Sequence, residues 1–182
     1  MTILTTIDPA TAEPKAKALL EGVQKKLGMT PNMMRVLAVN PTVLGAYLGF
    51  SGALAGGRLG AKLHEQIALT VAEANGCNYC LAAHTQLGKG AGLAPADILA
   101  ARAGTASDAR TAAALAFAGK LVASHGQVSP DDIAQARAGS LSDADLVEIV
   151  GAVAINVFTN YLNLAADTDV DFPPVATLAP AA

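Results

Sequence analysis

Hydrophobic residues along this chain recur at spacings of three and four, which is the period of an amphipathic helix. No segment shows the sustained alternation of apolar and polar residues that is typical of a strand. Glycine, proline and Ser or Asp residues interrupt the helical pattern at short intervals. We therefore expect an all-α protein with helices near residues 11–27, 32–39, 42–55, 60–75, 78–90, 95–103, 108–125, 130–138 and 143–166.

Particular residues mark the ends of these helices. Pro95 and Pro130 suit the first turn, where the missing N–H has no helical partner to lose. Ser129 and Ser142 suit N-caps. Helix exits are predicted at Gly28, Gly76, Gly104, Gly126 and Gly139. Beyond Asp167 the helical period stops, and we expect residues 168–182 to form an extended tail that lies along the surface and frays at its end.

A unit of short helix, turn and long helix occurs twice. The segment PADILAARAG at 95–104 returns as PDDIAQARAG at 130–139, and a Ser-Asp-Ala follows both copies. Two copies are too few for an open solenoid. The repeat therefore predicts a compact helical bundle with an internal helix-turn-helix duplication, forming one domain over residues 1–167. Its degenerate second repeat covers about 128–167.

Composition and charge limit the classes of function. A chain of 182 residues with 52% hydrophobic residues can bury a core, so a disordered protein is excluded. The net charge is −3 and Lys and Arg form no cluster, so no partner is expected among nucleic acids or anionic membranes. We see no signal-peptide pattern and no apolar run of membrane-spanning length, and we expect a cytoplasmic protein.

Both cysteines of the chain lie in one tetrapeptide, Cys77-Asn78-Tyr79-Cys80. A helix stop at Gly76 places Cys77 at or just before the first helical position and Cys80 within the first turn. Free backbone N–H groups and the helix dipole stabilise a thiolate there. Spacings of three and four put Cys77, Cys80 and His84 on one helix face, where the imidazole can exchange a proton with Cys80.

Glu65 is a possible fourth member of this group. On the preceding helix it falls between an apolar stripe and a stripe expected to face solvent. A carboxylate crowded by apolar neighbours needs a partner, and an imidazole on the next helix is one candidate. The alternative is that Glu65 turns outward to solvent. The apolar stripe comprises Leu63, Ile67 and Val71, and the solvent stripe Lys62, Gln66 and Glu73.

Other interpretations of the two thiols remain open. A Cys-x-x-Cys pair can be half of a structural zinc site, but a closed site needs four ligands and the chain has no second such pair. Taking His84 as third ligand and His64 or Glu65 as fourth would be irregular. Both thiols can also be inert core residues. We interpret His64 and His125 as ordinary surface or helix-end residues.

At Glu65, Cys77, Cys80 and His84 the sequence resembles the AhpD-like alkylhydroperoxidases of the carboxymuconolactone decarboxylase superfamily. The resemblance covers about residues 40–125 and extends to the run from 148 to 173. It implies an all-α homo-oligomer whose dithiol reduces peroxides, with Cys80 as peroxidatic and Cys77 as resolving cysteine. His84 and Glu65 match the proton relay. Tyr79 departs from the founding members, which carry a relay histidine there, and a phenol has a much higher pKa.

The resemblance implies a thiol-dependent peroxidase that acts on hydroperoxides without metal or cofactor. A dithiol reductant, such as a lipoyl domain or a thioredoxin-like protein, would restore the thiols. Two alternatives are a non-catalytic redox-sensing or binding protein and a decarboxylase-type lyase. Decarboxylases proper generally lack the Cys-x-x-Cys, so its presence here argues against the lyase.

The second repeat keeps the spacing of this motif without its chemistry. Aligning Glu65 with Glu148 places Asn160 opposite Cys77 and Asn163 opposite Cys80. We expect the helix that carries them to be scaffold only and Glu148 to be structural. Replacement of Asn163 by Ala should then leave the reactivity of the dithiol intact.

Overall fold

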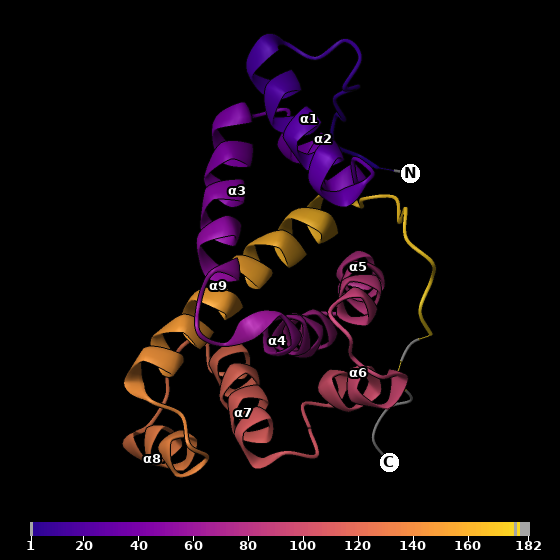
Figure 1. Ribbon diagram of the computed structural model, residues 1–182. Coiled ribbons are helices and arrows are strands. Elements are labelled where there is room, and N and C mark those ends of the chain that lie inside the picture. Colours follow the sequence, from indigo (N-terminus) through magenta and orange to yellow (C-terminus); the bar gives the residue numbers. More distant parts are fainter. Residues whose placement is uncertain (1, 177, 179–182) are drawn as a thin grey trace.

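The computed structural model describes residues 2–176 and 178, and within them it contains helices and no strand. The nine helices expected there are confirmed, and the fold class is all-α (Figure 1). They are α1 (Pro14–Leu27), α2 (Asn32–Leu37), α3 (Pro41–Ala55), α4 (Gly60–Ala74), α5 (Asn78–Gly90), α6 (Pro95–Arg102), α7 (Ala109–Ala123), α8 (Pro130–Ala138) and α9 (Asp143–Ala166).

Several helix ends differ from the prediction by one to three residues, and two of them have clear local reasons. Helix α1 begins at Pro14 because the preceding residues form a turn, in which the Asp8 carboxylate accepts the Ala10 N–H at 2.9 Å. Helix α7 ends at Ala123, since His125 adopts a left-handed φ of 54° that no helix continues. Both ends are determined by the local backbone conformation, which cannot be predicted from the spacing of hydrophobic residues.

The predicted caps are largely confirmed. Ser129 and Ser142 each form a capping box with the acidic residue three positions later. Gly139 follows α8 with φ −78°, and Ser140 takes the left-handed conformation instead. What requires a glycine at 139 is the close approach of Ala113 from α7. The other predicted exits have positive φ, at Gly28, Gly76, Gly104 and Gly126.

Helix α4 lies at the centre of the bundle, between α5, α6, α7 and α9 (Figure 1). Ile67, Leu69 and Val71 are fully buried. Gln66, which we expected in solvent, is only 8% exposed, so that prediction is wrong. The reason is that α6 and α7 cover this side of α4, where Gln66 lines a hollow together with Asp97 and Arg110. A single helix sequence cannot show how many neighbours it has.

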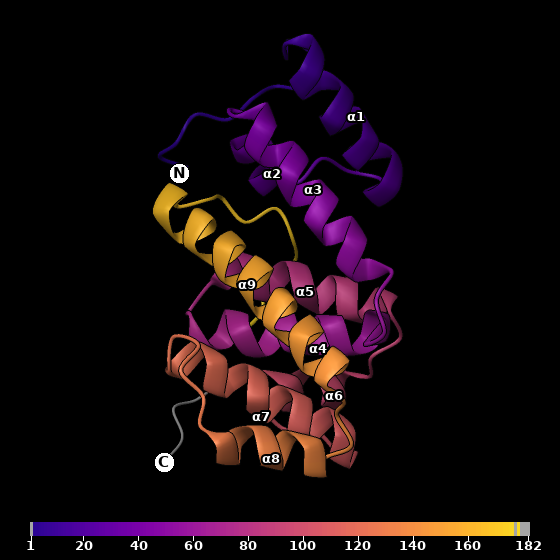
Figure 2. The ribbon, with the colours of Figure 1, turned by 90° about the vertical axis from the view of Figure 1, so that its left-hand side faces the viewer.

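Helix α9 crosses the whole bundle and packs on α4 and α7 (Figure 2). By length and composition alone it would be long and apolar enough to cross a membrane, contrary to the expectation that no segment is. Half of its most apolar stretch is buried inside the protein, and core helices pass the same test. The buried face also carries Asn156, Asn160 and Asn163, whose amides need partners.

Beyond α9 the chain is extended and runs along the surface, as expected. The Asp169 carboxylate accepts the backbone N–H and the hydroxyl of Thr2, both at 3.0 Å. The Asp171 carboxylate accepts the backbone N–H of Asn32 at 2.7 Å. These bonds tie the tail to the N-terminal segment and to the start of α2. Most of the end of the tail, where fraying was expected, lies outside the described residues.

Candidate redox site

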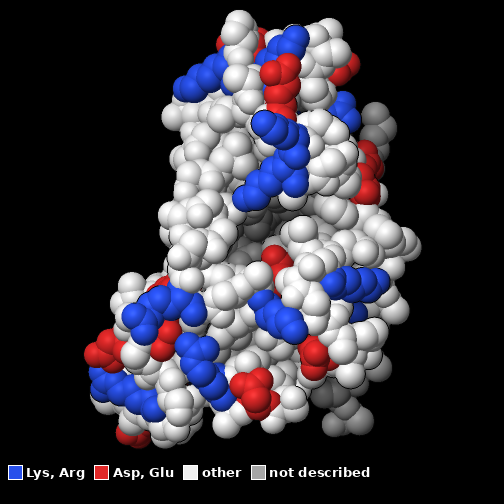
Figure 3. Space-filling model, in the orientation of Figure 1, with Lys and Arg blue, Asp and Glu red and all other residues white. Residues whose placement is uncertain are grey.

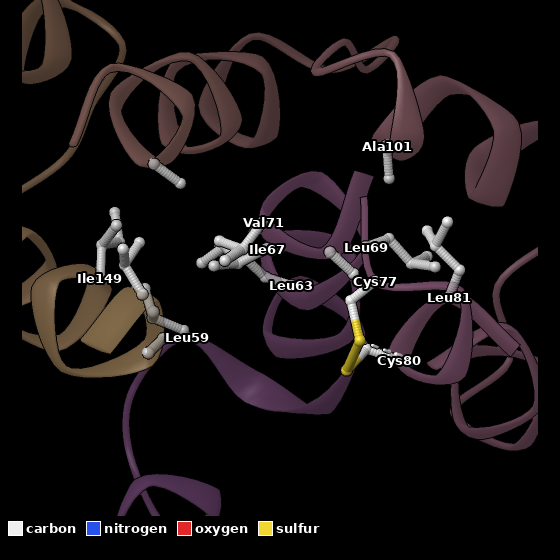
Figure 4. Close-up of a cluster of buried hydrophobic side chains, with 14 of the residues drawn as sticks. Leu59, Leu63, Ile67, Leu69, Val71, Cys77, Cys80, Leu81, Ala101 and Ile149 are labelled. Atoms are coloured by element: carbon white, nitrogen blue, oxygen red, sulfur yellow. Dashed lines mark hydrogen bonds between the residues drawn. A yellow bond between two sulfur atoms is a disulfide. The ribbon is translucent and has the colours of Figure 1, made fainter. Parts of the chain in front are cut away.

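The two cysteines lie where the chain turns from α4 into α5. Gly76 adopts a φ of 65°, Cys77 is the N-cap of α5, and Cys80 lies in its first turn, which confirms their predicted placement. The two residues are joined by a disulfide and are only 1% and 2% exposed. Figure 4 shows the disulfide next to Leu69, at the edge of the apolar cluster around α4.

The start of α5 directs a backbone hydrogen-bond donor at one of these sulfurs. The backbone N–H of Cys80 donates to Cys77 Sγ at 3.3 Å. The first N–H groups of a helix have no intrahelical acceptor, and their partial positive charge favours a thiolate. In the reduced protein the same position would stabilise a negative sulfur.

Glu65 and His84 connect α4 and α5 beside the dithiol. Glu65 Oε2 lies 2.8 Å from His84 Nδ1, and both side chains are 20% exposed. The expectation of an imidazole partner on the next helix is confirmed, and the solvent-facing alternative for Glu65 is wrong. Because a carboxylate only accepts, Nδ1 carries the proton and Nε2 is the ring nitrogen able to accept another.

Asn163 of α9 contacts the dithiol directly. Its Nδ2 donates to Cys80 Sγ at 3.3 Å, and the residue is 3% exposed. One turn earlier, Asn160 accepts a bond of 2.9 Å from Asn75 at the end of α4. Helix α9 thus packs beside the dithiol, and its expected role as scaffold only stays a prediction. In the alignment of the two repeats Asn163 stands opposite Cys80, and in the structure the two side chains are in contact.

Tyr79 turns toward α2 and the tail. Its hydroxyl accepts the backbone N–H of Met33 at 3.1 Å, and its ring meets that of Phe172 edge-on at 5.7 Å. Burial raises the pKa of Tyr79 far above its ordinary value; the Met33 bond opposes the rise, and the negative charge of Asp171 adds to it. A phenol of this kind keeps its proton at neutral pH, unlike a histidine.

Tyr47 of α3 is a neighbour of the site that the sequence did not indicate. Burial raises its pKa, a hydrogen bond with Ser51 opposes this, and the nearby Glu65 carboxylate adds to the rise. Its ring also lies 6.3 Å from that of Phe158 in α9. Figure 3 shows the surface hollowed between α1–α3 and the part of the bundle around α4 and α5. Only the packing of α3 brings this phenol to Glu65.

A second Glu–His pair lies at the start of α4. Glu148 of α9 accepts the backbone N–H groups of Arg58 and Leu59 at 2.8 and 3.1 Å and lies 3.0 Å from His64 Nε2. Gly57 has no side chain at the place that this carboxylate occupies. Burial by itself would raise the pKa of Glu148, but the hydrogen bonds outweigh it and lower the pKa. These bonds agree with a structural role for Glu148. They also give His64, which we expected to be an ordinary surface or helix-end residue, a carboxylate partner near the start of α4.

Among residues 2–176 and 178, no three His, Cys, Asp or Glu side chains are placed so that they could hold a metal ion. Each histidine proposed above as an irregular zinc ligand has a carboxylate partner instead: Glu148 for His64 and Glu65 for His84.

Comparison with known proteins agrees with this arrangement. Residues 41–123, from α3 to the end of α7, match the family model described as the carboxymuconolactone decarboxylase family. An uncharacterized peroxidase-related protein from Silicibacter sp. TM1040 has a structure similar to this one, with 26% sequence identity, a TM-score of 0.79 and 91% of each chain covered. This match and the shared fold support a place for the chain in the carboxymuconolactone decarboxylase superfamily.

Further solved structures share the fold of this chain. The alkylhydroperoxidase AhpD core of an uncharacterized peroxidase-related protein from Ralstonia eutropha JMP134 has 22% identity, a TM-score of 0.84 and coverage of 93% of this chain and 92% of that one. The debrominase Bmp8 has 24% identity, a TM-score of 0.80 and coverage of 94% and 93%. A search of curated proteins finds no match.

Proposed function

We propose that this protein is a thiol-dependent peroxidase that reduces hydroperoxides through the Cys77–Cys80 pair. One observation carries the proposal: the Cys77–Cys80 pair lies at the start of α5, one turn before His84. The Nδ1 atom of His84 is in turn held by Glu65 Oε2 at 2.8 Å. The combination supplies a nucleophilic sulfur, an electrostatic environment for its thiolate and a group that transfers protons.

The reaction follows from these groups. His84 Nε2 takes the proton of the Cys80 thiol, and the thiolate attacks the terminal oxygen of ROOH, which breaks the O–O bond. The alkoxide leaves as ROH with the proton from His84, and Cys80 becomes a sulfenic acid. The Cys77 sulfur then displaces the hydroxyl as water and forms the disulfide. Glu65 orients the ring throughout. The sulfurs supply both electrons, so the cycle needs no metal or cofactor.

The disulfide must be reduced before another cycle. A dithiol reductant, such as a lipoyl domain or a thioredoxin-like protein, fits the chemistry because thiol–disulfide exchange with a dithiol leaves no mixed disulfide behind. Reductants of this kind keep thiols reduced in the cytoplasm, and we propose that this protein is cytoplasmic.

The proposal is tested by titrating the reduced protein with one equivalent of cumene hydroperoxide. Both thiols should be consumed, cumyl alcohol should form in equal amount, and dithiothreitol or dihydrolipoamide should restore both thiols. Retention of two free thiols would contradict the proposal. A redox-sensing protein would form the disulfide once but show no steady consumption of peroxide with excess reductant.

Reductive debromination is the second candidate, because Bmp8 shares the fold and a cysteine-to-alanine variant of it was solved in complex with 2,3,4-tribromopyrrole. Two thiols can replace an aryl C–Br bond by C–H, with release of HBr and formation of the disulfide. The same titration with 2,3,4-tribromopyrrole, followed by bromide analysis, separates the two candidates. Bromide release without any reaction with hydroperoxide would favour the debrominase.

We also propose that the chain forms a homo-oligomer through α3 and α9. Helix α3 contains no charged residue, and only its Leu44 is buried. Phe50 of α3 and Phe158 and Tyr161 of α9 are exposed. Helices α3 and α9 both lie toward the viewer in Figure 2. Light scattering should give a multiple of 18.2 kDa, and Phe50→Glu together with Tyr161→Glu should reduce it to the monomer mass.

A further inference from the structure

Only one side of the Asn163 amide is satisfied. Nδ2 donates to Cys80 Sγ, whereas Oδ1 is buried and has no hydrogen-bond partner. A buried carbonyl oxygen without a donor is unfavourable, and native proteins leave few of them. Both atoms are attached to the same carbon, so the unpaired acceptor lies within one amide group of the reactive sulfur. The reaction proposed above brings a hydroxyl group to this sulfur.

Other buried polar atoms without hydrogen-bond partners lie on the same part of the chain as Asn163. Most of the buried side-chain polar atoms that lack partners in the described part of the chain belong to the end of α9 and the tail, at Asn160, Asn163, Thr168 and Asp171. Thr168 is adjacent to Asn163, whose backbone carbonyl accepts its N–H at 3.1 Å. These unpaired polar atoms thus gather on the segment of the chain that brings Asn163 to the dithiol.

We propose that Asn163 is a catalytic residue of the peroxidase reaction, an inference that rests on the proposed function. Its amide N–H stabilises the Cys80 thiolate. Its amide oxygen accepts the O–H of the bound hydroperoxide, and it keeps this bond when the oxygen has moved to sulfur as the sulfenic acid. The sulfur gains the OH, the O–O bond breaks, and the alkoxide takes its proton from His84. When Cys77 then forms the disulfide, the OH leaves as water and the bond to Asn163 ends.

The role of Asn163 is tested with two variants made in a Cys77→Ser background, in which the sulfenic acid cannot be resolved. Asn163→Asp keeps the shape and an acceptor but replaces the donor by a negative charge. Asn163→Leu removes both. The matched control is Asn156→Leu on the same helix, because Asn156 is also buried but its Nδ2 bonds to the Ala152 carbonyl of its own helix at 2.8 Å. Circular dichroism verifies that each variant folds.

Two rates are measured. The first is alkylation of Cys80 by iodoacetamide as a function of pH, and its midpoint should move to higher pH in both Asn163 variants because the thiolate loses its donor. The second is the reaction of Cys80 with cumene hydroperoxide, followed by dimedone capture of the sulfenic acid. It should fall about tenfold to a hundredfold in Asn163→Leu, as for loss of a hydrogen bond to a charged group. Asn156→Leu should match the parent in both.

Different results overturn different parts. An unchanged alkylation midpoint in Asn163→Asp and Asn163→Leu would overturn the donor role. An unchanged peroxide rate in Asn163→Leu, with a parent protein that reacts, would overturn this inference and leave the proposed function standing. A wild-type protein that ignores hydroperoxide would overturn the proposed function itself, and the alkylation profiles would still decide whether Asn163 stabilises the thiolate.

Discussion

Glu65 Oε2 lies 2.8 Å from His84 Nδ1, and this contact joins two consecutive helices beside the disulfide. Because Glu65 is on α4 and His84 is on α5, the pair also bridges the turn that carries Cys77. Both side chains are partly exposed, whereas the two sulfurs are buried. The Glu65–His84 pair is thus partly accessible to solvent, whereas the dithiol is not.

The relay predicts the effect of removing either member. His84→Ala should lower kcat/KM for hydroperoxide by about 10² to 10⁴, the usual contribution of a general acid–base group. Glu65→Gln should have a smaller effect, because it only weakens the orientation of the ring. In both variants the thiolate absorbance at 240 nm should appear at higher pH than in the wild type. His125→Ala, at an exposed helix end, is the control. Equal titration in all proteins would show that the pair does not act on the thiol.

The assignment of the two cysteines makes opposite predictions for single substitutions. Cys77→Ser should react once with hydroperoxide and accumulate a sulfenic acid on Cys80, because no thiol remains to resolve it. Cys80→Ser should not react, although its Cys77 keeps its place at the helix start. Mass spectrometry after dimedone treatment measures both. A sulfenic acid found on Cys77 of Cys80→Ser, with Cys77→Ser inactive, would reverse the roles.

Tyr79 is predicted to act on stability and not on the peroxide reaction. Tyr79→Phe removes the acceptor of the Met33 N–H and leaves that donor buried, so urea unfolding should show a loss of about 1 to 3 kcal/mol. The ring contact with Phe172 is kept. The rate of reaction with hydroperoxide should stay within about twofold of the wild type. A large loss of rate with unchanged stability would place the phenol in the relay after all.

The lowered pKa of Glu148 predicts that the stability of the folded protein depends on pH. Its pKa in the folded protein is held below the ordinary value of 4.5 by hydrogen bonds from Arg58, Leu59 and His64, which outweigh the effect of burial. A carboxyl whose pKa is lowered by folding stabilises the protein above the unfolded value, and this contribution is lost as the pH falls through the folded value. Glu148→Gln should therefore be less stable than the wild type at pH 7, and the difference should shrink as the pH is lowered from about 5 toward 3.

The measurement is urea unfolding of both proteins across this range, with Glu21→Gln as control because Glu21 is exposed on α1. A constant difference between Glu148→Gln and the wild type would mean that the charge of Glu148 does not contribute.

Much of this architecture could be predicted from the sequence, because its causes are local. Helical period, proline, glycine and serine caps depend on residues within one turn, and they located the helices to within a few residues. The position of Cys77 and Cys80 at a helix start followed from Gly76, which ends the helix before them. Even the partner of Glu65 could be predicted, because the two helices that carry Glu65 and His84 are consecutive and joined by a short turn.

What the tertiary structure decided depends on segments far apart in the chain. Asn163 reaches Cys80 over a separation of 83 residues because α9 crosses the turn between α4 and α5. Packing of α6 and α7 buried Gln66, and packing of α9 gave His64 its carboxylate. The sequence by itself therefore determined where helices begin and which residue types stand on each. Which residues meet, including the Asn163 amide and the Cys80 sulfur, depends on how several helices pack against one another at once. No local sequence pattern records this packing.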